Sequence, residues 1–383
     1  MIYFDNAATT FPKPLKVVDE MRRCLTVYGG NPGRGAHSLS LAAAKKVFEC
    51  RSELAEFFGA SDTDRVFFTL NATHGINTVI KGLLKKGDHV IISDMEHNAV
   101  FRPIHKLAAE GIVEYDVFKT LVCDERQTPL RICANIAKLI RPNTKMVFCT
   151  HTSNICSMSL PIREIGAFCH KHGILFCVDA AQSAGHIAID MLQMNIDALC
   201  IPGHKGLYGP QGSGAVILGK GITLDTLTEG GNGIDSLMPE MSIQAPERYE
   251  AGTVSTPAIA GLCEGIRVVR SLGVENICGE ERRIATKLCE VIGNVKGATV
   301  YAPQYEGGIV LFDIEGISSE KLASLLDTYG VCARGGYHCA ALAHKTLGTR
   351  DGGAVRLSLG MFNRIGEVDA FYRALTSAIK DAK

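Results

Sequence analysis

The sequence lacks a net charge and any long apolar run. Lys and Arg together number 40, as do Asp and Glu, so the formal net charge at pH 7 is zero. A neutral chain gives no electrostatic reason to expect nucleic acid or a membrane surface as a partner. No apolar stretch approaches the length that spans a bilayer, and the first residues contain no basic segment followed by an apolar one. We therefore expect a cytoplasmic protein that binds a small molecule.

The sequence also lacks closely paired cysteines. Fourteen cysteines are scattered through 383 residues, and no C-x-x-C pair occurs. Such a distribution predicts free thiols, because a disulfide framework is typical of short secreted chains. The nearest approach to a ligand cluster, His338-Cys339 with His344, does not have the four-ligand spacing of a structural zinc site. We expect no bound metal.

Hydrophobic periodicity predicts an α/β fold with a mostly parallel sheet. Short apolar runs bounded by turn residues alternate with longer amphipathic stretches, which is typical of strands and helices in turn. The predicted strands are residues 65–69, 89–93, 145–150, 175–179, 198–201 and 214–218, and the helices between them include 74–84, 130–140 and 162–172.

The pattern changes after about residue 252, which predicts a second domain. Two long helices are expected over 256–272 and 274–292, followed by strands near 308–314 and 354–359. A chain of this length usually forms two packed domains. We predict a large domain over 14–252 and a smaller α+β domain built from 1–13 and 253–383.

The chemically reactive side chains follow predicted strands. Asp179 ends one strand, and Lys205 lies just beyond the next, while Thr73 and His74 open a helix. Ligands bind at the carboxyl ends of parallel strands, and helix N-termini bind phosphate. A carboxylate that holds a pyridine nitrogen protonated and an amine that bonds to an aldehyde suit pyridoxal phosphate. Taken alone, Asp179 could instead cap a helix, and Lys205 could be a solvated loop lysine.

Nine motifs in order along the chain carry a resemblance to a known family. They are YFDNAATT at 3–10, NATHGIN at 71–77, MEHN at 95–98, HTSN at 151–154, VDAAQ at 178–182, GHK at 203–205, EAGT at 250–253, RGGYHCA at 334–340 and VRLS at 355–358. The chain resembles class V aminotransferases, and within them the cysteine desulfurases and selenocysteine lyases that have a compact cysteine loop. The resemblance covers essentially the whole chain. It implies a fold type I pyridoxal-phosphate transferase with a seven-stranded sheet.

The resemblance implies a role for each matching residue around pyridoxal phosphate. Lys205 matches the lysine that bonds to the cofactor and shuttles the α-proton, Asp179 matches the partner of the ring nitrogen, and Gln182 matches the donor to the ring hydroxyl. His97 matches the histidine stacked on the ring; a buried histidine bonded to nearby backbone is the alternative. Phosphate contacts match Thr73, His74, His204 and Thr253, the last reaching the neighbouring subunit's site, which implies a homodimer.

The resemblance also implies how substrate is held. Arg356 matches the arginine that grips the substrate carboxylate, a group suited to the guanidinium fork. Asn154 matches a second contact, and Arg34 and Arg334 are either further contacts or surface cations.

Cys339 matches the sulfur-accepting thiol of the same family. Arg334 and the potentially cationic His338 lie near it in the sequence and would favour its thiolate. The implied reaction converts L-cysteine to L-alanine and leaves a persulfide on Cys339, from which a sulfur-acceptor protein would take the sulfur.

Other functions stay open from the sequence. Selenocysteine lyase activity on L-selenocysteine uses the same framework. Another class V reaction would need no thiol, and a non-catalytic sulfur-relay protein would not need Lys205. The chain departs from the family at three positions around the cofactor: Ala72 and Pro202 stand where hydroxyl residues are common, and His74 stands where Glu is frequent.

Overall fold

A seven-stranded sheet forms the centre of the molecule. The computed structural model describes residues 1–33, 35–125, 127–234, 236–304, 307–349 and 351–382. The strand order is β2-β8-β7-β6-β5-β3-β4, with β8 antiparallel to both of its neighbours and the remaining pairs parallel. The strands are β2 (Val66–Thr69), β3 (Asp88–Ser93), β4 (Val113–Phe118), β5 (Thr144–Thr150), β6 (Leu175–Asp179), β7 (Ala198–Pro202) and β8 (Gly214–Leu218). This confirms the predicted α/β class and the mostly parallel sheet.

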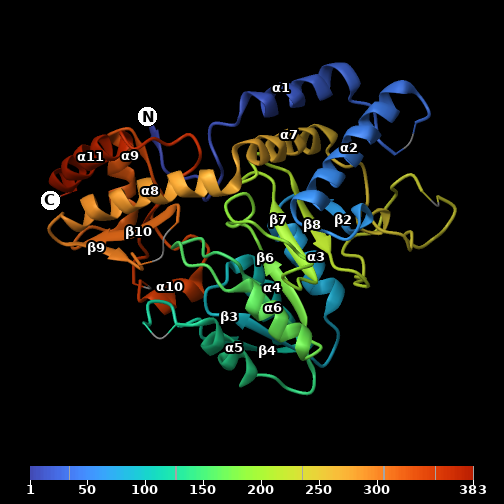
Figure 1. Ribbon diagram of the computed structural model, residues 1–383, viewed down its shortest axis with the longest axis horizontal. Coiled ribbons are helices and arrows are strands. Elements are labelled where there is room, and N and C mark those ends of the chain that lie inside the picture. The colour runs from blue at the N-terminus through green and yellow to red at the C-terminus, as the bar shows by residue number, and fades with distance from the viewer. Residues whose placement is uncertain (34, 126, 235, 305–306, 350, 383) are drawn as a thin grey trace.

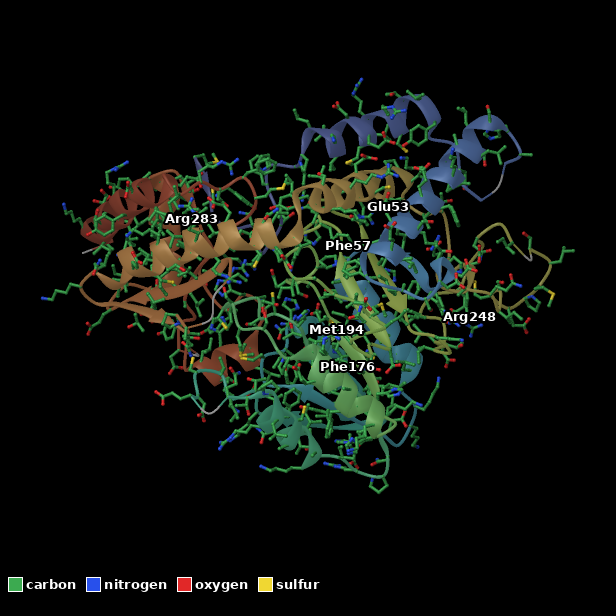
Figure 2. All side chains as sticks on the ribbon, in the orientation of Figure 1. Glu53, Phe57, Phe176, Met194, Arg248 and Arg283 are labelled. Atoms are coloured by element: carbon green, nitrogen blue, oxygen red, sulfur yellow. The ribbon has the colours of Figure 1, made fainter. Side chains whose placement is uncertain are left out.

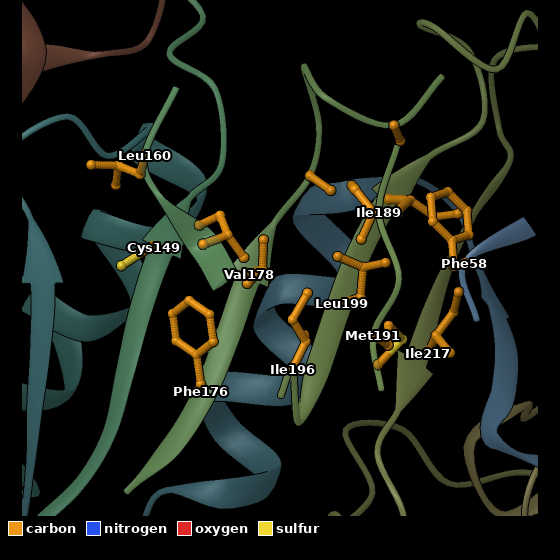
Figure 3. Close-up of a cluster of buried hydrophobic side chains, with 14 of the residues drawn as sticks. Phe58, Cys149, Leu160, Phe176, Val178, Ile189, Met191, Ile196, Leu199 and Ile217 are labelled. Atoms are coloured by element: carbon orange, nitrogen blue, oxygen red, sulfur yellow. The ribbon is translucent and has the colours of Figure 1, made fainter. Parts of the chain in front are cut away.

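The central strands are buried on both faces, which explains their continuous apolar runs. Side chains that alternate along a strand point to opposite faces of the sheet. Accordingly, Phe176 and Val178 join one core cluster, whereas Cys177, between them, joins the other. Figure 3 shows the first cluster, in which Phe176, Val178, Leu199 and Ile217 project from successive strands.

Strand β4 was not among the predicted strands. It lies at the edge of the sheet, and its middle residues are exposed or half-buried. Polar residues therefore alternate with Val113, Tyr115 and Val117, and this alternation was the available signal for an edge strand.

Helices between the strands cover the sheet. Four of them follow β2, β3, β4 and β5 in turn: α3 (Ala72–Leu83), α4 (Asn98–Ala109), α5 (Pro129–Ala137) and α6 (Ile162–Lys171). Helix α3 begins two residues before its predicted start, because Asn71 caps it by accepting a hydrogen bond from the His74 amide (2.9 Å).

Three further helices pack together beside the sheet, at the top of Figure 1. They are α1 (Leu15–Arg23), α2 (Ser38–Phe57) and α7 (Thr256–Leu272). Glu53 of α2, labelled in Figure 2, forms ion pairs with Arg267 (2.8 Å) and Arg270 (2.7 Å) of α7. Ile259 and Leu262 of α7 belong to the core cluster of the large sheet. The domain boundary after residue 252 stays a prediction. Helix α7 follows that boundary in the sequence, yet it packs on the core of the large sheet.

A three-stranded antiparallel sheet forms a separate core. Its order is β12 (Val355–Ser358), β10 (Ile309–Ile314) and β9 (Ala298–Tyr301), and β1 (Ile2–Tyr3) pairs in parallel with β11 (Val331–Cys332). The helices here are α8 (Val274–Gly293), α9 (Ser319–Thr328) and α11 (Glu367–Ala382). Helix α10 (Ala341–Leu347) instead contributes Ala343 to the core cluster of the large sheet. Short helical turns elsewhere are Cys24–Tyr28, Thr63–Arg65 and Glu247–Tyr249. Both chain ends lie on this side of the molecule (Figure 1). Among the described residues, no helix has the length and apolar character that crossing a membrane requires.

Candidate active site

The carboxyl ends of the central strands open onto one cavity. Thr150 ends β5 and Asp179 ends β6, and the two are register partners, so both reach the same edge of the sheet. Lys205 lies three residues beyond β7, the next strand. Seven residues predicted from the sequence line this cavity: Thr73, His97, Asn154, Asp179, Gln182, His204 and Lys205.

Lys205 and Asp179 shift each other's ionisation inside this cavity. Desolvation by the surrounding protein lowers the pKa of Lys205 to about 8, although the charge of Asp179 opposes that shift. Burial raises the pKa of Asp179. The Ala181 amide, which donates to Asp179 Oδ1 (2.9 Å), and the charge of Lys205 both oppose this rise. A lysine with this pKa is partly neutral near pH 8 and can act as a nucleophile or base.

His97 faces the cavity from the first turn of α4. Its Nδ1 accepts a hydrogen bond from the Ala99 amide (3.0 Å), so His97 is also the N-cap of that helix. Desolvation, together with the nearby cations Lys205 and Arg356, lowers the pKa of His97 to about 4. The ring is therefore neutral at pH 7 and presents a flat, uncharged face.

The opposite end of the cavity is built for an anion. Thr73 lies in the first turn of α3, where amide N–H groups have no partner within the helix. His204 also lines the cavity, and its buried Nδ1 has no hydrogen-bond partner among the described residues. His74, in contrast, is not a lining residue, and its Nδ1 accepts from the Leu70 amide (3.3 Å).

Arg356 is a buried cation beside the cavity, on β12. Its Nη2 donates to Asp5 Oδ1 (2.8 Å) and its Nη1 to the Asn154 carbonyl (2.9 Å). Burial lowers its pKa, although Asp5 opposes the shift. Its buried Nε lacks a hydrogen-bond partner within the described part of the chain. A buried guanidinium with an unused donor is suited to an anionic ligand.

Cys339 is exposed, and its turn is tied to the cavity. The Asn98 amide, next to His97, donates to the Cys339 carbonyl (2.8 Å). Cavity-lining Asn154 donates from Nδ2 to the His338 carbonyl (2.7 Å). Arg334 is exposed and forms an antiparallel backbone bridge with Arg356. The exposed thiol therefore belongs to a loop anchored beside Asn154 and His97.

His338 cannot supply the positive charge that the sequence suggested. Burial, followed by the charge of Arg356, lowers the pKa of His338 to about 3, so its ring is neutral at pH 7. Arg356, and not His338, is the buried cation whose charge interacts with that of Cys339.

Thr253 does not line the cavity of its own chain. Thr253 is exposed, and its Oγ1 accepts a hydrogen bond from Asn31 Nδ2 (3.3 Å) at a separate hollow. Arg34 lies outside the described residues. Gln182 does line the cavity, and its Nε2 donates to the Ala7 carbonyl (3.0 Å), which brings the start of the chain to the site.

Two site residues were missed by sequence reasoning although both lie in the quoted motifs. Asp5 pairs with Arg356. Glu96 is buried, accepts from the Thr150 amide (2.8 Å) and from the Ser93 hydroxyl, and burial raises its pKa to about 8. The only sequence feature that could have indicated Asp5 and Glu96 is their position within the quoted motifs, because ion pairing and burial cannot be read from the sequence alone.

Comparison with protein families identifies the group to which the chain is related. The model of the family "Aminotransferase class-V" matches residues 2–371. The chain belongs to this family. Class V aminotransferases are in general pyridoxal-phosphate enzymes, and the cavity contains a strand-end carboxylate, a lysine of lowered pKa and an anion-binding helix start, which that cofactor requires.

Curated relatives and a solved structure indicate which group within the family the chain resembles. A "Probable cysteine desulfurase" of Methanothermobacter thermautotrophicus is 34% identical over 377 residues, which cover 96% of this chain and 92% of the relative. A "Cysteine desulfurase" of Salmonella agona is 30% identical over 98% of this chain and 93% of its own length. The apo structure of a cysteine desulfurase from Thermococcus onnurineus NA1 has 30% identity, a TM-score of 0.89, and coverage of 99% of this chain and 95% of that one. These two relatives and this solved structure are all described as cysteine desulfurases.

Proposed function

We propose that this protein is a pyridoxal-phosphate-dependent cysteine desulfurase, which converts L-cysteine to L-alanine and receives the sulfur on Cys339 as a persulfide. One observation carries the proposal. The exposed Cys339 lies in a turn whose carbonyl groups bond to Asn98 and to Asn154, beside the cavity of Lys205 and Asp179. Other class V reactions do not need a thiol at that place.

The cavity residues fit the proposed cofactor. Lys205 Nζ would hold the aldehyde carbon, and Asp179 would hold the ring nitrogen protonated. Thr73 and the unpartnered Nδ1 of His204 would bind the phosphate, and the neutral ring of His97 would cover the cofactor ring. When bound, pyridoxal phosphate supplies an electron sink for charge that develops at the substrate α-carbon.

The chain's own side chains would carry out the remaining steps. Lys205 Nζ takes the proton from the substrate α-carbon, since a pKa of about 8 leaves part of the amine neutral near pH 7 to 8. Arg356 and Asn154 bind the substrate carboxylate, with Arg334 and Arg34 as additional cations at the entrance. The Cys339 thiolate would then attack the substrate sulfur. The new S–S bond forms as the carbon–sulfur bond of the substrate breaks, and the electron pair of that bond stays with the substrate carbon, which is protonated to give alanine.

The proposal extends to assembly and to the fate of sulfur. Thr253 does not line the cavity of its own chain and is exposed, so it is available to a neighbouring subunit's site in a homodimer. The persulfide on an exposed Cys339 is accessible to a sulfur-acceptor protein. We place the reaction in the cytoplasm.

The Cys339→Ser variant tests this function. It should bind pyridoxal phosphate and cysteine with wild-type spectra yet form alanine from cysteine at least about a hundredfold more slowly, because a hydroxyl accepts sulfur far less readily than a thiolate. With selenocysteine the loss should be smaller, since selenium leaves more readily. Assays of alanine, sulfide and selenide, with mass spectrometry of the persulfide, measure these outcomes.

Cys332→Ser is the matched control, because Cys332 is a half-buried thiol on β11 and should be dispensable. Wild-type turnover of cysteine by Cys339→Ser, or a persulfide found on another cysteine, would contradict the proposal.

A further inference from the structure

A chain of side-chain hydrogen bonds begins at His338, the residue before Cys339, and none of its members lines the cavity. His338 Nε2 contacts the Arg334 carbonyl (3.0 Å), and His338 Nδ1 contacts His344 Nε2 (3.2 Å). His344 Nδ1 in turn contacts Thr349 Oγ1 (2.7 Å). The two imidazole rings stack at 5.5 Å with an interplanar angle of 16°. We call these three side chains, His338, His344 and Thr349, the histidine chain. All three are buried.

The partners determine the direction of every hydrogen bond in the histidine chain. A carbonyl only accepts, so His338 Nε2 carries the proton and, in a neutral ring, His338 Nδ1 accepts. His344 Nε2 must then donate, which leaves His344 Nδ1 to accept from the Thr349 hydroxyl. The same hydroxyl lies 3.4 Å from the His344 carbonyl, a longer alternative. If His338 Nδ1 donated to His344 instead, both nitrogens of the His338 ring would carry protons. The ring would then be a cation, which burial and the charge of Arg356 disfavour. All groups of the chain are thus satisfied with both rings neutral.

The turn above the histidine chain has an unusual backbone. His338 has a φ of 51° and Cys339 a φ of 56°. Two consecutive non-glycine residues in the left-handed region are disfavoured, so surrounding contacts must hold them. The turn directs the His338 carbonyl to Asn154 and the Cys339 carbonyl to Asn98.

We propose that His344, oriented by Thr349, is a positioning residue that fixes the His338 ring and thereby holds Cys339 in its left-handed turn over the site. The inference rests on the proposed desulfurase function, because it concerns the placement of the sulfur-accepting thiol. His344 does not touch the cavity, so its effect passes through His338. A held turn keeps the Cys339 thiol within reach of bound substrate without the cost of ordering a mobile loop at each turnover.

Four variants of the holoenzyme test the proposal. His344→Phe keeps a flat ring but removes both hydrogen bonds, and Thr349→Val removes only the hydroxyl. His344→Gln can still donate to His338 and serves as the conservative rescue. Thr346→Val is the matched control, because Thr346 is an exposed threonine on α10 outside the histidine chain.

The first readout separates transfer of sulfur from binding of substrate. In single turnovers His344→Phe should transfer sulfur to Cys339 about tenfold to a hundredfold more slowly, with a cysteine Kd changed by less than about twofold. Thr349→Val should show a smaller loss in the same direction, His344→Gln should recover most of the rate, and Thr346→Val should match wild type.

The second readout is amide hydrogen exchange over residues 334–340, which requires no activity. The Ala340 amide donates to the Tyr337 carbonyl (2.9 Å), and the Gly336 amide to Ala354 (3.1 Å). Both amides should exchange at least about tenfold faster in His344→Phe, with exchange in the central strands unchanged.

Two results would overturn the positioning role. One is wild-type sulfur transfer in both His344→Phe and Thr349→Val. The other is an equal loss in His344→Phe and His344→Gln accompanied by equally weakened cysteine binding, which would mean that His344 only packs. If His344→Phe fails to fold, Thr349→Val against Thr346→Val decides the matter. If wild-type protein forms no alanine, the proposed function fails, and the exchange measurement still decides whether His344 holds the turn.

Discussion

Single residues owe their reactivity to burial. Lys205, Glu96 and His97 all have shifted pKa values, and desolvation is the largest cause in each case. Protein surroundings penalise the charged form, which lowers the pKa of a base and raises that of an acid. The cavity therefore holds a partly neutral lysine and a neutral histidine without any unusual residue type.

Lys205 should make the stability of the cofactor-free protein depend on pH. Its folded pKa of about 8 lies below the ordinary value of 10.5, so the unfolded chain binds more protons between these pH values. The unfolding free energy should therefore rise with pH in this window, by about 2 to 3 kcal/mol relative to Lys205→Met. Urea unfolding of both proteins under reducing conditions, from pH 7.5 to 10.5, measures the difference. Parallel curves would contradict a lowered pKa of Lys205.

At the scale of elements, helix starts and strand ends bring the reactive groups together. His97 caps α4 and Asn71 caps α3, and both caps line the cavity together with Asp179 and Lys205. One side chain can thus stabilise a helix and serve the site. His97 does both.

The two roles of His97 can be separated by substitution. Asn is a good N-cap, so His97→Asn should retain the stability of α4, whereas His97→Ala should lower the unfolding free energy by about 1 kcal/mol. Both variants lose the flat ring, and both should lose most desulfurase activity. Urea unfolding of the cofactor-free variants and alanine assays of the holoenzymes give the two measurements. Full activity in His97→Asn would mean that the ring is not needed.

At the scale of the whole molecule, the site is expected to be completed by a second subunit. Thr253 lies at a hollow apart from the cavity of its own chain. Several apolar side chains of α1 and α2 are also strongly exposed, namely Leu15, Val18, Leu41 and Phe48. Burial of such side chains in a two-fold interface would stabilise a dimer.

Subunit complementation tests the shared site. Thr253→Glu should repel the cofactor phosphate of the partner, and Lys205→Ala should lose covalent attachment, so each homodimer should be nearly inactive. In a mixed dimer one site would contain both intact residues, and a 1:1 co-expression should restore about a quarter of wild-type activity. No recovery in demonstrated mixed dimers, or a fully active monomer in sedimentation, would contradict the prediction.

The sequence alone was sufficient for features that depend on local pattern. The continuous apolar runs predicted six of the seven central strands, because a strand buried on both faces must be apolar throughout. The strand-end positions of Asp179 and Lys205 followed from the same runs. Edge strand β4 was missed because its four middle residues are exposed or half-buried and its run is interrupted by polar residues.

Only the tertiary structure decided which groups meet and in what charge state. Asp5 and Arg356 pair although 351 positions separate them, and no local pattern encodes such a contact. The sequence suggested a cationic His338 beside Cys339, but the fold buries that ring against His344 and makes it neutral. Residue types near a strand end can be read from the sequence, whereas ionisation depends on desolvation and on neighbours that folding brings from distant parts of the chain.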